Sequence, residues 1–284
     1  MKLPISAVIL TYNEEKDIDA CIRSVNDWAD EIFIVDSYST DKTLEIVRQY
    51  TDKIYQNPFE NYAQQRNWAQ ENLPIKNEWV FHLDADERIS IELTMELKRI
   101  FSSSVDADGF IVARKTIFRK RWIRHGGHYP VYHLRLFKKK RGRCEERLYD
   151  QHYAVKGKIE RAKGDIINII TPDLSAWRSR HKKWAALEAQ EVLFNRNRTA
   201  YTGSGSRCAP IQERKRLRYH YYKMPLFIRS FFYFFYRYII RLGLLDGMRG
   251  SAFHFWQGFW YRFLVDTEIY KLKRKRPGQG CIVK

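Results

Sequence analysis

Two carboxylates one residue apart, Asp84 and Asp86, follow directly after the apolar run Trp79-Val80-Phe81-His82-Leu83. A short apolar run of this kind predicts a buried strand, so the carboxylates stand at its carboxyl end. Oxygen ligands select Mg²⁺ or Mn²⁺, and Mg²⁺ is typically held by one or two carboxylates together with substrate phosphates. The pattern therefore predicts a site for Mn²⁺ or Mg²⁺, with a solvated acidic turn as the alternative.

Two strand–helix units precede this motif. An apolar run at residues 5–10 ends in Thr11-Tyr12-Asn13-Glu14-Glu15, and a second run at residues 32–35 ends in Asp36-Ser37-Tyr38-Ser39-Thr40-Asp41. Apolar residues at helical spacing follow each run, which predicts a parallel α/β sheet. Ligands of such sheets bind outside the carboxyl ends of the strands. The alternative is that Asp36 and Asp41 only cap the helices that follow them.

Four motifs occur in a fixed order along the first third of the chain: TYNEE, DSYSTD, Gln65-Arg66-Asn67 and DADE. Together they resemble family-2 glycosyltransferases of the GT-A fold, over about residues 1–115. The branch most similar contains the lipopolysaccharide-core β-1,4-glucosyltransferase-like and exopolysaccharide enzymes. Tyr38 stands where the family usually has glycine, which predicts that this turn does not need a positive φ.

The resemblance implies roles for individual residues. The leaving group of the reaction is a nucleoside diphosphate, and a metal ion and basic side chains would stabilise its developing charge. Thr11, Tyr12 and Glu14 are expected at the nucleotide, with Tyr12 and Glu14 lining the base pocket; Asp36 is expected at the base or ribose, Arg66 near the nucleotide, Asp84 at ribose or metal, and Asp86 as the principal metal ligand. Arg135 resembles the arginine of the family's Arg-Leu-Phe stretch and is expected at a diphosphate.

A catalytic base is expected near Cys144-Glu145-Glu146-Arg147. An inverting transfer needs a carboxylate to accept the proton of the attacking hydroxyl. The resembled branch has a His-Glu pair in this stretch, and Glu145 stands where the histidine would be. Glu146 is therefore the first candidate, Glu145 the second and Asp150 the third. The alternative is a salt-bridged turn on the surface.

Charge divides the chain, whose net charge is +18. Residues 1–109 hold 11 basic and 21 acidic residues, whereas residues 110–143 hold 12 basic residues and no acid. A basic face can mean nucleic acid, anionic lipid or solvation. No nucleic-acid-binding motif is present, which favours lipid. The four cysteines lack metal-site spacing, and the absence of a signal peptide predicts a cytoplasmic catalytic part.

Aromatic residues gather near the carboxyl terminus, with 18 Phe, Tyr and Trp between Tyr219 and Phe263. Residues 226–245 are apolar apart from Arg229, Arg237 and Arg241, which are too costly for an isolated membrane span. On one helix these arginines share a face, opposite Phe231, Phe232, Phe234, Phe235 and Ile239. We expect an amphipathic helix at the membrane surface, with the arginines on anionic head groups. The alternative is a core helix pair or a dimer interface.

The expected fold is α/β, a GT-A nucleotide-sugar domain with a mostly parallel sheet and a basic, aromatic-rich helical region for membrane association. The glycosyltransferase domain is expected at residues 1–200, with a nucleotide-binding half at 1–115 and an acceptor half at 116–200, and the membrane-associating region at 201–284. The expected activity is metal-dependent, inverting hexose transfer from a nucleotide sugar, first of all a UDP-sugar, to a lipid-linked saccharide or glycolipid at the cytoplasmic face of a bacterial inner membrane. Alternatives are transfer to a polyprenyl phosphate, or a non-catalytic sugar-nucleotide-binding scaffold.

Overall fold

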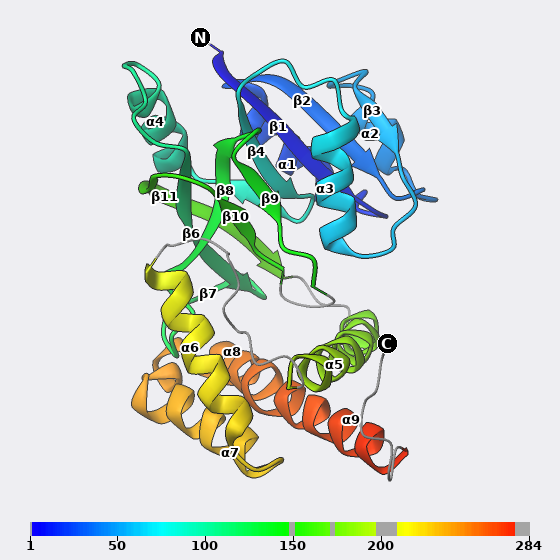
Figure 1. Cartoon of the computed structure of the whole chain (residues 1–284), viewed down its shortest axis with the longest axis vertical. Helices are drawn as coiled ribbons and strands as arrows, with labels where there is room; N and C mark the ends of the chain where they lie inside the picture. The colour runs from blue at the N-terminus through cyan, green and yellow to red at the C-terminus, as the bar shows by residue number, and fades with distance from the viewer. Residues whose placement is uncertain (1, 148–150, 171–173, 197–208, 276–284) are drawn as a thin grey trace.

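A nine-stranded mixed sheet forms the centre of the protein in the computed structural model (Figure 1). The structure describes residues 2–147, 151–170, 174–196 and 209–275, so Asp150 lies outside the described residues. The strand order is β3-β2-β1-β4-β8-β6-β11-β5, with β7 paired to β6. The strands are β1 (Leu3–Thr11), β2 (Ala29–Asp36), β3 (Ile54–Gln56), β4 (Trp79–Asp84), β5 (Glu87–Ile89), β6 (Gly109–Phe118), β7 (Arg121–Ile123), β8 (Val131–Lys138) and β11 (Ile159–Ile170); β9 (Gly142–Cys144) and β10 (Tyr153–Val155) form a separate antiparallel pair.

The first four strands of this order form the parallel α/β sheet that the sequence predicts. Side chains of β1 alternate between two cores, because successive residues of a strand point to opposite faces. Ile5 and Ile9 pack with helix α1 (Ile18–Asn26), whereas Val8 and Leu10 pack with helix α3 (Tyr62–Asn72). Both faces of the parallel half are therefore buried. The other helices of this half are α2 (Thr43–Val47) and α4 (Ile91–Ile100).

The second half of the sheet is mixed rather than parallel. Strand β8 is antiparallel to both β4 and β6, and β11 runs parallel to β6 and antiparallel to β5. The pairing of Asn168 with Glu87 brings the end of β11 beside the DADE motif. The expected boundary between residues 115 and 116 falls inside β6, so it divides one strand.

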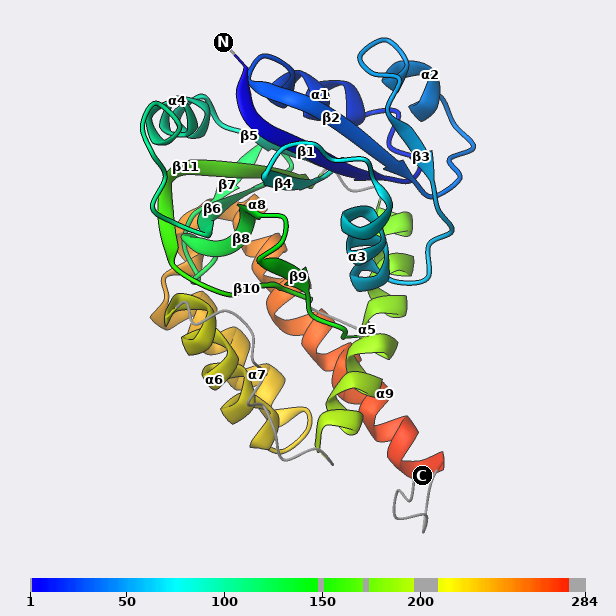
Figure 2. The ribbon, with the colours of Figure 1, turned by 45° about the horizontal axis from the view of Figure 1, so that its top comes forward.

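A layer of helices lies against one end of the sheet (Figure 2). Ala185 and Ala189 of α5 form a buried cluster with Tyr261, Val265 and Ile269 of α9. The expected boundary near residue 200 therefore divides helices that pack together. The layer consists of α5 (Leu174–Arg196), α6 (Ala209–Lys223), α7 (Ile228–Phe235), the π-helix η1 (Tyr236–Ile240), the 3₁₀-helix η2 (Gly243–Asp246), α8 (Gly247–Phe253), the π-helix η3 (His254–Trp260) and α9 (Tyr261–Lys275).

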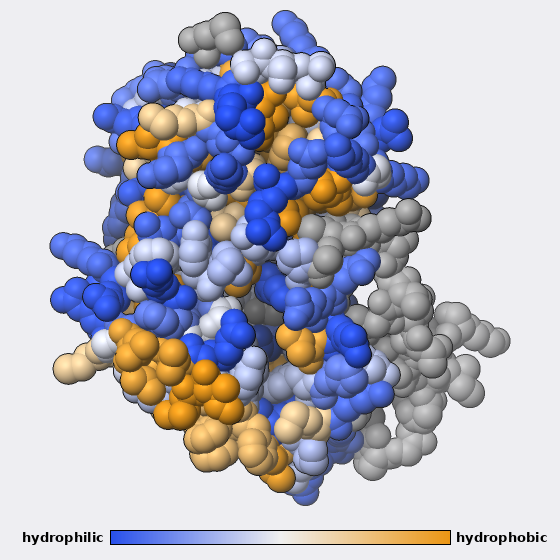
Figure 3. All heavy atoms as spheres, turned by 90° about the vertical axis from the view of Figure 1, so that its left-hand side faces the viewer, coloured by the Kyte–Doolittle hydropathy of each residue, from blue (hydrophilic) through white to orange (hydrophobic). Residues whose placement is uncertain are grey.

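The expectation of one amphipathic helix over residues 226–245 is wrong. Helix α7 passes into η1 and the chain then turns at Leu242, whose φ is 58°. Phe231 is 58% exposed and Phe235 is 45% exposed. Figure 3 shows a hydrophobic area low on the molecule, on the helical layer. Phe234 instead packs against Tyr238 and the rings of η3.

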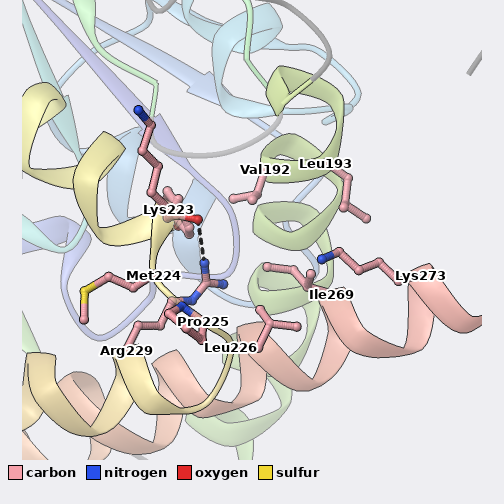
Figure 4. A pocket seen from close by; sticks show the side chains of 10 residues that line it. Val192, Leu193, Lys223, Met224, Pro225, Leu226, Arg229, Ile269 and Lys273 are labelled. Carbon is pink, nitrogen blue, oxygen red and sulfur yellow. Dashed lines mark hydrogen bonds between the residues drawn. The ribbon is translucent and has the colours of Figure 1, made fainter.

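Two of the three arginines, Arg229 and Arg237, are turned toward the protein rather than toward solvent. Arg229 is only 2% exposed; its Nε donates to Asp266 Oδ1 at 2.7 Å, and its Nη1 donates to the Tyr222 carbonyl at 3.3 Å (Figure 4). Arg237 donates to the Gly126 carbonyl, and only Arg241 of the three is exposed. The expected contact of all three arginines with lipid phosphates is therefore wrong for Arg229 and Arg237, because protein acceptors already hold their guanidinium groups.

Asp266 explains why α7 buries its arginine. Its carboxylate is completely buried, and it accepts hydrogen bonds from the Phe227 amide at 2.8 Å and the Ser230 hydroxyl at 2.7 Å, besides those from Arg229. A buried charge is tolerated only when it is paired and hydrogen-bonded. Within the described residues, no helix has the length and apolar character required to cross a bilayer.

Removing Arg229 tests whether this pair holds the helical layer together. Arg229→Ala leaves the Asp266 carboxylate buried without its cation, so we expect the free energy of unfolding to fall by about 3–5 kcal/mol. The matched control is Arg241→Ala on the same stretch, an exposed arginine, which is expected to change stability by less than about 0.5 kcal/mol. Urea unfolding of both variants measures the difference, and equal stabilities would contradict the assignment.

Candidate active site

The polar motifs meet at the carboxyl edge of the parallel strands. The register pairs Thr11 with Asp36 and Leu10 with Asp84, so the loops after β1, β2 and β4 leave the sheet side by side. The loops after β1 and β2 are hydrogen-bonded to each other. The Asn13 amide donates to Ser39 Oγ at 2.9 Å, and the Thr40 amide donates to Asn13 Oδ1 at 2.8 Å.

Asp36 holds the turn after β2. Its buried carboxylate accepts hydrogen bonds from the Ser39 amide and from Gln56 Nε2, both at 3.0 Å. Tyr38 within this turn has φ 63°, so the expectation that the position avoids a positive φ is wrong. A left-handed conformation costs a non-glycine residue of order 1–3 kcal/mol, and the hydrogen bonds to Asp36 hold it here. Contact of Asp36 with a nucleotide stays a prediction.

Exposed aromatic rings surround these loops. Tyr12 is 56% exposed and Tyr38 is 52% exposed, while Phe59 and Tyr62 lie beside each other with ring centroids 5.0 Å apart. Thr11, in contrast, is buried at the strand end. Flat aromatic side chains offer stacking surfaces to a nucleotide base. The edge therefore carries apolar surface next to its carboxylates.

Asp84 is the centre of a buried network of charges. Arg66 Nη2 lies 3.1 and 3.2 Å from its two carboxylate oxygens, and Arg135 Nη2 lies 3.1 Å from Oδ2. Arg135 also donates to Glu87 Oε1 at 2.8 Å. Although burial opposes ionisation, Arg66 and Arg135 hold the pKa of Asp84 well below its usual range. Arg135 is only 5% exposed, so it pairs with carboxylates rather than facing open solvent.

Asp86 has the opposite electrostatic environment. Its carboxylate receives one long hydrogen bond, from Asn168 Nδ2 at 3.5 Å. Burial and the neighbouring carboxylates, first Glu87 and then Asp84, raise the pKa of Asp86 to about 8. Glu14 shares this environment, and burial followed by the charge of Asp17 raises its pKa to about 7. Negative charge at this edge exceeds what the arginines neutralise.

A divalent cation fits this excess of charge. Mg²⁺ and Mn²⁺ prefer oxygen ligands, and Mg²⁺ sites often use only one or two carboxylates with substrate phosphates completing the shell. Asp86, with Asp84 two residues before it, supplies such a set. Over the described part of the chain, no group of three or more His, Cys, Asp or Glu is arranged to hold a metal by itself.

The two neighbouring base candidates differ in their surroundings. Glu146 has a side chain that is 74% exposed, and it accepts from Arg143 Nη2 at 3.2 Å. Arg143 also donates to Glu71, so Glu146 belongs to the surface salt bridge that the sequence left open as an alternative. Glu145 is half-buried, with its Oε2 atom enclosed by protein. Of the two candidates, Glu145 is therefore the more enclosed, and the choice of base stays a prediction.

Asn67 of the Gln-Arg-Asn motif connects the segment of Glu145 to the carboxyl edge of the parallel strands. Its Nδ2 donates to the Cys144 carbonyl at 3.1 Å, and its Oδ1 accepts from the Cys144 amide at 2.9 Å. The next residue along the chain is Glu145, and the residue before Asn67 is Arg66, which holds Asp84. One turn of α3 thus fixes both β9 and the charge network.

Sequence reasoning missed two residues of this edge. Glu87 completes the charge network, and its place in the DADE motif was an available signal. Arg180 on α5 is exposed, and its positive charge acts against the raised pKa of Glu14 and of Asp86. Helix α5 follows the end of β11, beside Asp86, and Figure 2 shows it below the ends of the parallel strands. No motif signals Arg180, since its position depends on the path of β11.

Two small cavities lie away from this edge. One, of about 160 Å³, is in the helical layer between α5, α9 and the α6–α7 connection (Figure 4). The other, of about 180 Å³, is lined by Lys2, Asn26 and Glu31 near the amino ends of the strands. Neither includes Asp84, Asp86 or Glu145, so both are separate from the candidate site.

Comparison with known families defines the class of protein. A profile described as Glycosyl transferase family 2 matches residues 6–154, more than half of the chain. The chain belongs to glycosyl transferase family 2, which confirms the resemblance carried by its four motifs. Its mixed sheet has the GT-A fold of these enzymes.

Individual relatives match the amino-terminal part. An uncharacterized glycosyltransferase of Rickettsia bellii is 42% identical over 99 residues, 35% of this chain and 33% of that protein. The lipopolysaccharide core biosynthesis glycosyltransferase LpsC of Rhizobium meliloti is 39% identical over 119 residues, 40% of this chain and 43% of that protein. The chain thus spans about a third of the length of the first relative and less than half of the length of the second.

A solved structure supports the fold over almost the whole chain. The mannosyltransferase PcManGT from Pyrobaculum calidifontis, in complex with GDP-Man and Mn²⁺, aligns with 97% of this chain and 87% of its own. The TM-score is 0.51 at 13% identity, so the likeness shows the fold alone.

Paired substitutions separate the roles of the two aspartates. Asp84→Asn removes the charge shared by Arg66 and Arg135, and we expect the free energy of unfolding to fall by about 3 kcal/mol. The pKa of Asp86 is raised in the folded protein, so its ionisation lowers the stability of the fold above about pH 4. Asp86→Asn removes this destabilising charge. At pH 7.5 in EDTA we therefore expect this variant to be at least as stable as the wild type, and more stable by about 1 kcal/mol. Chemical unfolding measures both, and an Asp86→Asn variant as unstable as Asp84→Asn would contradict the distinction.

Proposed function

We propose that this protein transfers a hexose from a nucleotide sugar to a lipid-linked saccharide or glycolipid, with inversion at the anomeric carbon. The observation that supports this best is the edge where Asp86, exposed aromatic rings and the Arg66–Asp84–Arg135–Glu87 network meet. LpsC, a relative over the amino-terminal part, is named for lipopolysaccharide core biosynthesis, which favours an acceptor of the bacterial envelope.

The donor occupies the carboxyl edge of β1, β2 and β4. Tyr12 and Tyr38 offer their exposed rings to the base, and Glu14 and Asp36 supply carboxylates for hydrogen bonds from the base or ribose. A UDP-sugar is the first candidate. GDP-Man, which is bound in the structure of PcManGT, is the second.

Asp86, with Asp84, would hold Mn²⁺ or Mg²⁺ against the donor diphosphate. The cation, when bound, supplies positive charge where the leaving diphosphate gains negative charge. The chain itself adds Arg180 on the α5 side of the edge. Arg66 and Arg135 keep Asp84 ionised and in place, so their part is to position a ligand rather than to meet the diphosphate.

Glu145 is the proposed base. The acceptor hydroxyl gives its proton to the Glu145 carboxylate while its oxygen attacks the anomeric carbon, and the nucleoside diphosphate leaves from the opposite face. Its half-buried position beside Cys144 keeps it near the donor edge, whereas Glu146 faces solvent. A lipid-linked acceptor favours a reaction at the cytoplasmic face of a bacterial inner membrane, which is part of this proposal.

A donor screen tests the proposed activity. Purified protein is incubated with UDP-, GDP- and dTDP-sugars, with Mn²⁺, with Mg²⁺ or with EDTA, and nucleotide release is measured. We expect release from one nucleotide class that depends on the divalent cation. Release that continues unchanged in EDTA would overturn the metal role, and no nucleotide binding by calorimetry would overturn the donor assignment.

The neighbouring glutamates provide an internal comparison for the base. Glu145→Gln keeps the shape of the side chain but removes the proton acceptor, so we expect transfer to fall by on the order of 10²–10⁴-fold with donor binding retained. Glu146→Gln, one residue away and exposed, is the matched control and is expected to stay within about twofold of the wild type. Product formation with a lipid-linked saccharide acceptor measures both. The reverse result would return the role to Glu146, and full activity of both variants would favour a phosphate acceptor, which needs no strong base.

A further inference from the structure

The outward face of α7 and η1 is apolar, whereas a helix face exposed to water is normally polar. Arg229 and Ser230 are buried, while Ile228, Phe231 and Phe232 are each more than half exposed. An amphipathic helix normally turns its polar side to solvent and its apolar side to the core. Since the polar side of this helix is already used by Asp266, the apolar side remains uncovered.

The exposed apolar area continues past the end of η1. Ile240 is 60% exposed, Leu245 is 51% exposed and Met248 is 91% exposed. We call the exposed apolar side chains from Ile228 to Met248 the apolar crest. Figure 3 shows hydrophobic surface low on the molecule, where the helical layer lies. Contiguous apolar surface of this extent marks an interaction site in soluble proteins.

Exposed negative charge is absent from the crest. The only carboxylate between Tyr219 and Val265 in the sequence is Asp246, which is 2% exposed. His125 Nδ1 and His254 Nε2 lie 2.7 and 2.9 Å from its two oxygens, so its charge is enclosed by protein. The crest therefore presents apolar and cationic groups to an approaching partner.

Basic residues border the crest at the β6–β7 turn. Arg119, Lys120 and Arg121 are exposed, and Arg121 Nε donates to the Asp246 carbonyl at 3.1 Å. Arg249, next to Met248, donates from Nη1 to the Arg119 carbonyl at 3.0 Å. These contacts hold the basic turn beside the apolar side chains. We call Arg119, Lys120, Arg121 and Arg249 the basic rim.

We propose that the apolar crest and the basic rim form a docking surface for an anionic bilayer. The crest enters the boundary between head groups and acyl chains, and the rim contacts lipid phosphates. A second copy of this chain is disfavoured as the occupant. A symmetric contact through the crest would bring two basic rims close together, with no exposed carboxylate on either crest to pair with them.

This inference rests on the proposed lipid-linked acceptor for its purpose, but its test does not depend on sugar transfer. Vesicle binding is measured without donor, acceptor or metal. A protein that binds vesicles but transfers no sugar would overturn the proposed activity alone, and one that transfers sugar but ignores vesicles would overturn the docking surface alone.

The experiment compares two kinds of substitution by co-sedimentation with phosphatidylglycerol–phosphatidylcholine vesicles. Phe231→Ser/Phe232→Ser/Leu245→Ser removes apolar side chains from the crest, and we expect the partition coefficient to fall more than tenfold at all salt concentrations. Arg119→Glu/Lys120→Glu reverses charge on the rim. Because exposed charges are screened over about 10 Å at 0.1 M salt, this variant is expected to lose binding at low salt and to approach the wild type at high salt.

Matched controls carry the same changes at the other end of the molecule. Ile91 and Met95 of α4 are 72% and 66% exposed, so Ile91→Ser/Met95→Ser removes equally exposed apolar surface. Lys98→Glu/Lys163→Glu makes the same charge change near α4. Both controls are expected to bind vesicles as the wild type does. Circular dichroism melting of all four variants verifies that each is folded.

Three results would overturn the proposal, in whole or in part. The first is vesicle binding by the folded crest variant that equals the wild type. The second is a wild-type protein that ignores anionic vesicles and runs as a dimer in light scattering, with the crest variant a monomer, which would assign the crest to a second copy of the chain. Equal binding to neutral and anionic vesicles would remove the basic rim from the docking surface.

Discussion

The buried pairing of Asp84 with Arg66 and Arg135 is the constraint on which the candidate site depends. Arg66 comes from α3, Asp84 from β4, Arg135 from β8 and Glu87 from β5, so four elements meet through charged side chains. Moving these charges out of water is costly unless every one of them is paired. The network therefore tolerates little displacement of any element. It leaves Asp86, two residues further along, as the carboxylate whose charge a ligand can neutralise.

The strand ends of the parallel half were predictable from the sequence. Apolar runs followed by polar clusters identify where each strand stops, and parallel strands bring such clusters to one edge. The roles of Arg66 and Arg135 were not predictable in the same way. An arginine near a diphosphate site and an arginine that holds a carboxylate look the same in one sequence, and only the register of β8 against β4 decides between them. The choice between Glu145 and Glu146 depends likewise on one residue of register after β9.

The helical layer shows a different limit of sequence reasoning. Periodicity separates Arg229 from Phe231 and Phe235, but it does not say which side faces the protein. Asp266 lies on another helix far along the sequence, and its buried carboxylate draws Arg229 inward. Tyr38 is a similar case at the scale of one residue. Side-chain hydrogen bonds to Asp36 impose a backbone conformation that the residue type alone disfavours.

The place of β8 in the sheet has a consequence for how the chain acquires its structure. Strand β8 covers the edge of β4 and supplies Arg135 to Asp84, although β8 follows β4 by about fifty residues. A chain shortened to its first 115 residues would keep all four family motifs, yet β4 would become an open edge and Asp84 would lose one of its two cations. Residues 1–115 alone therefore lack the strand that covers β4 and one cation of the charge network around Asp84. During synthesis, the carboxyl edge of the parallel strands takes its final form only after the ribosome has released residues well beyond the DADE motif.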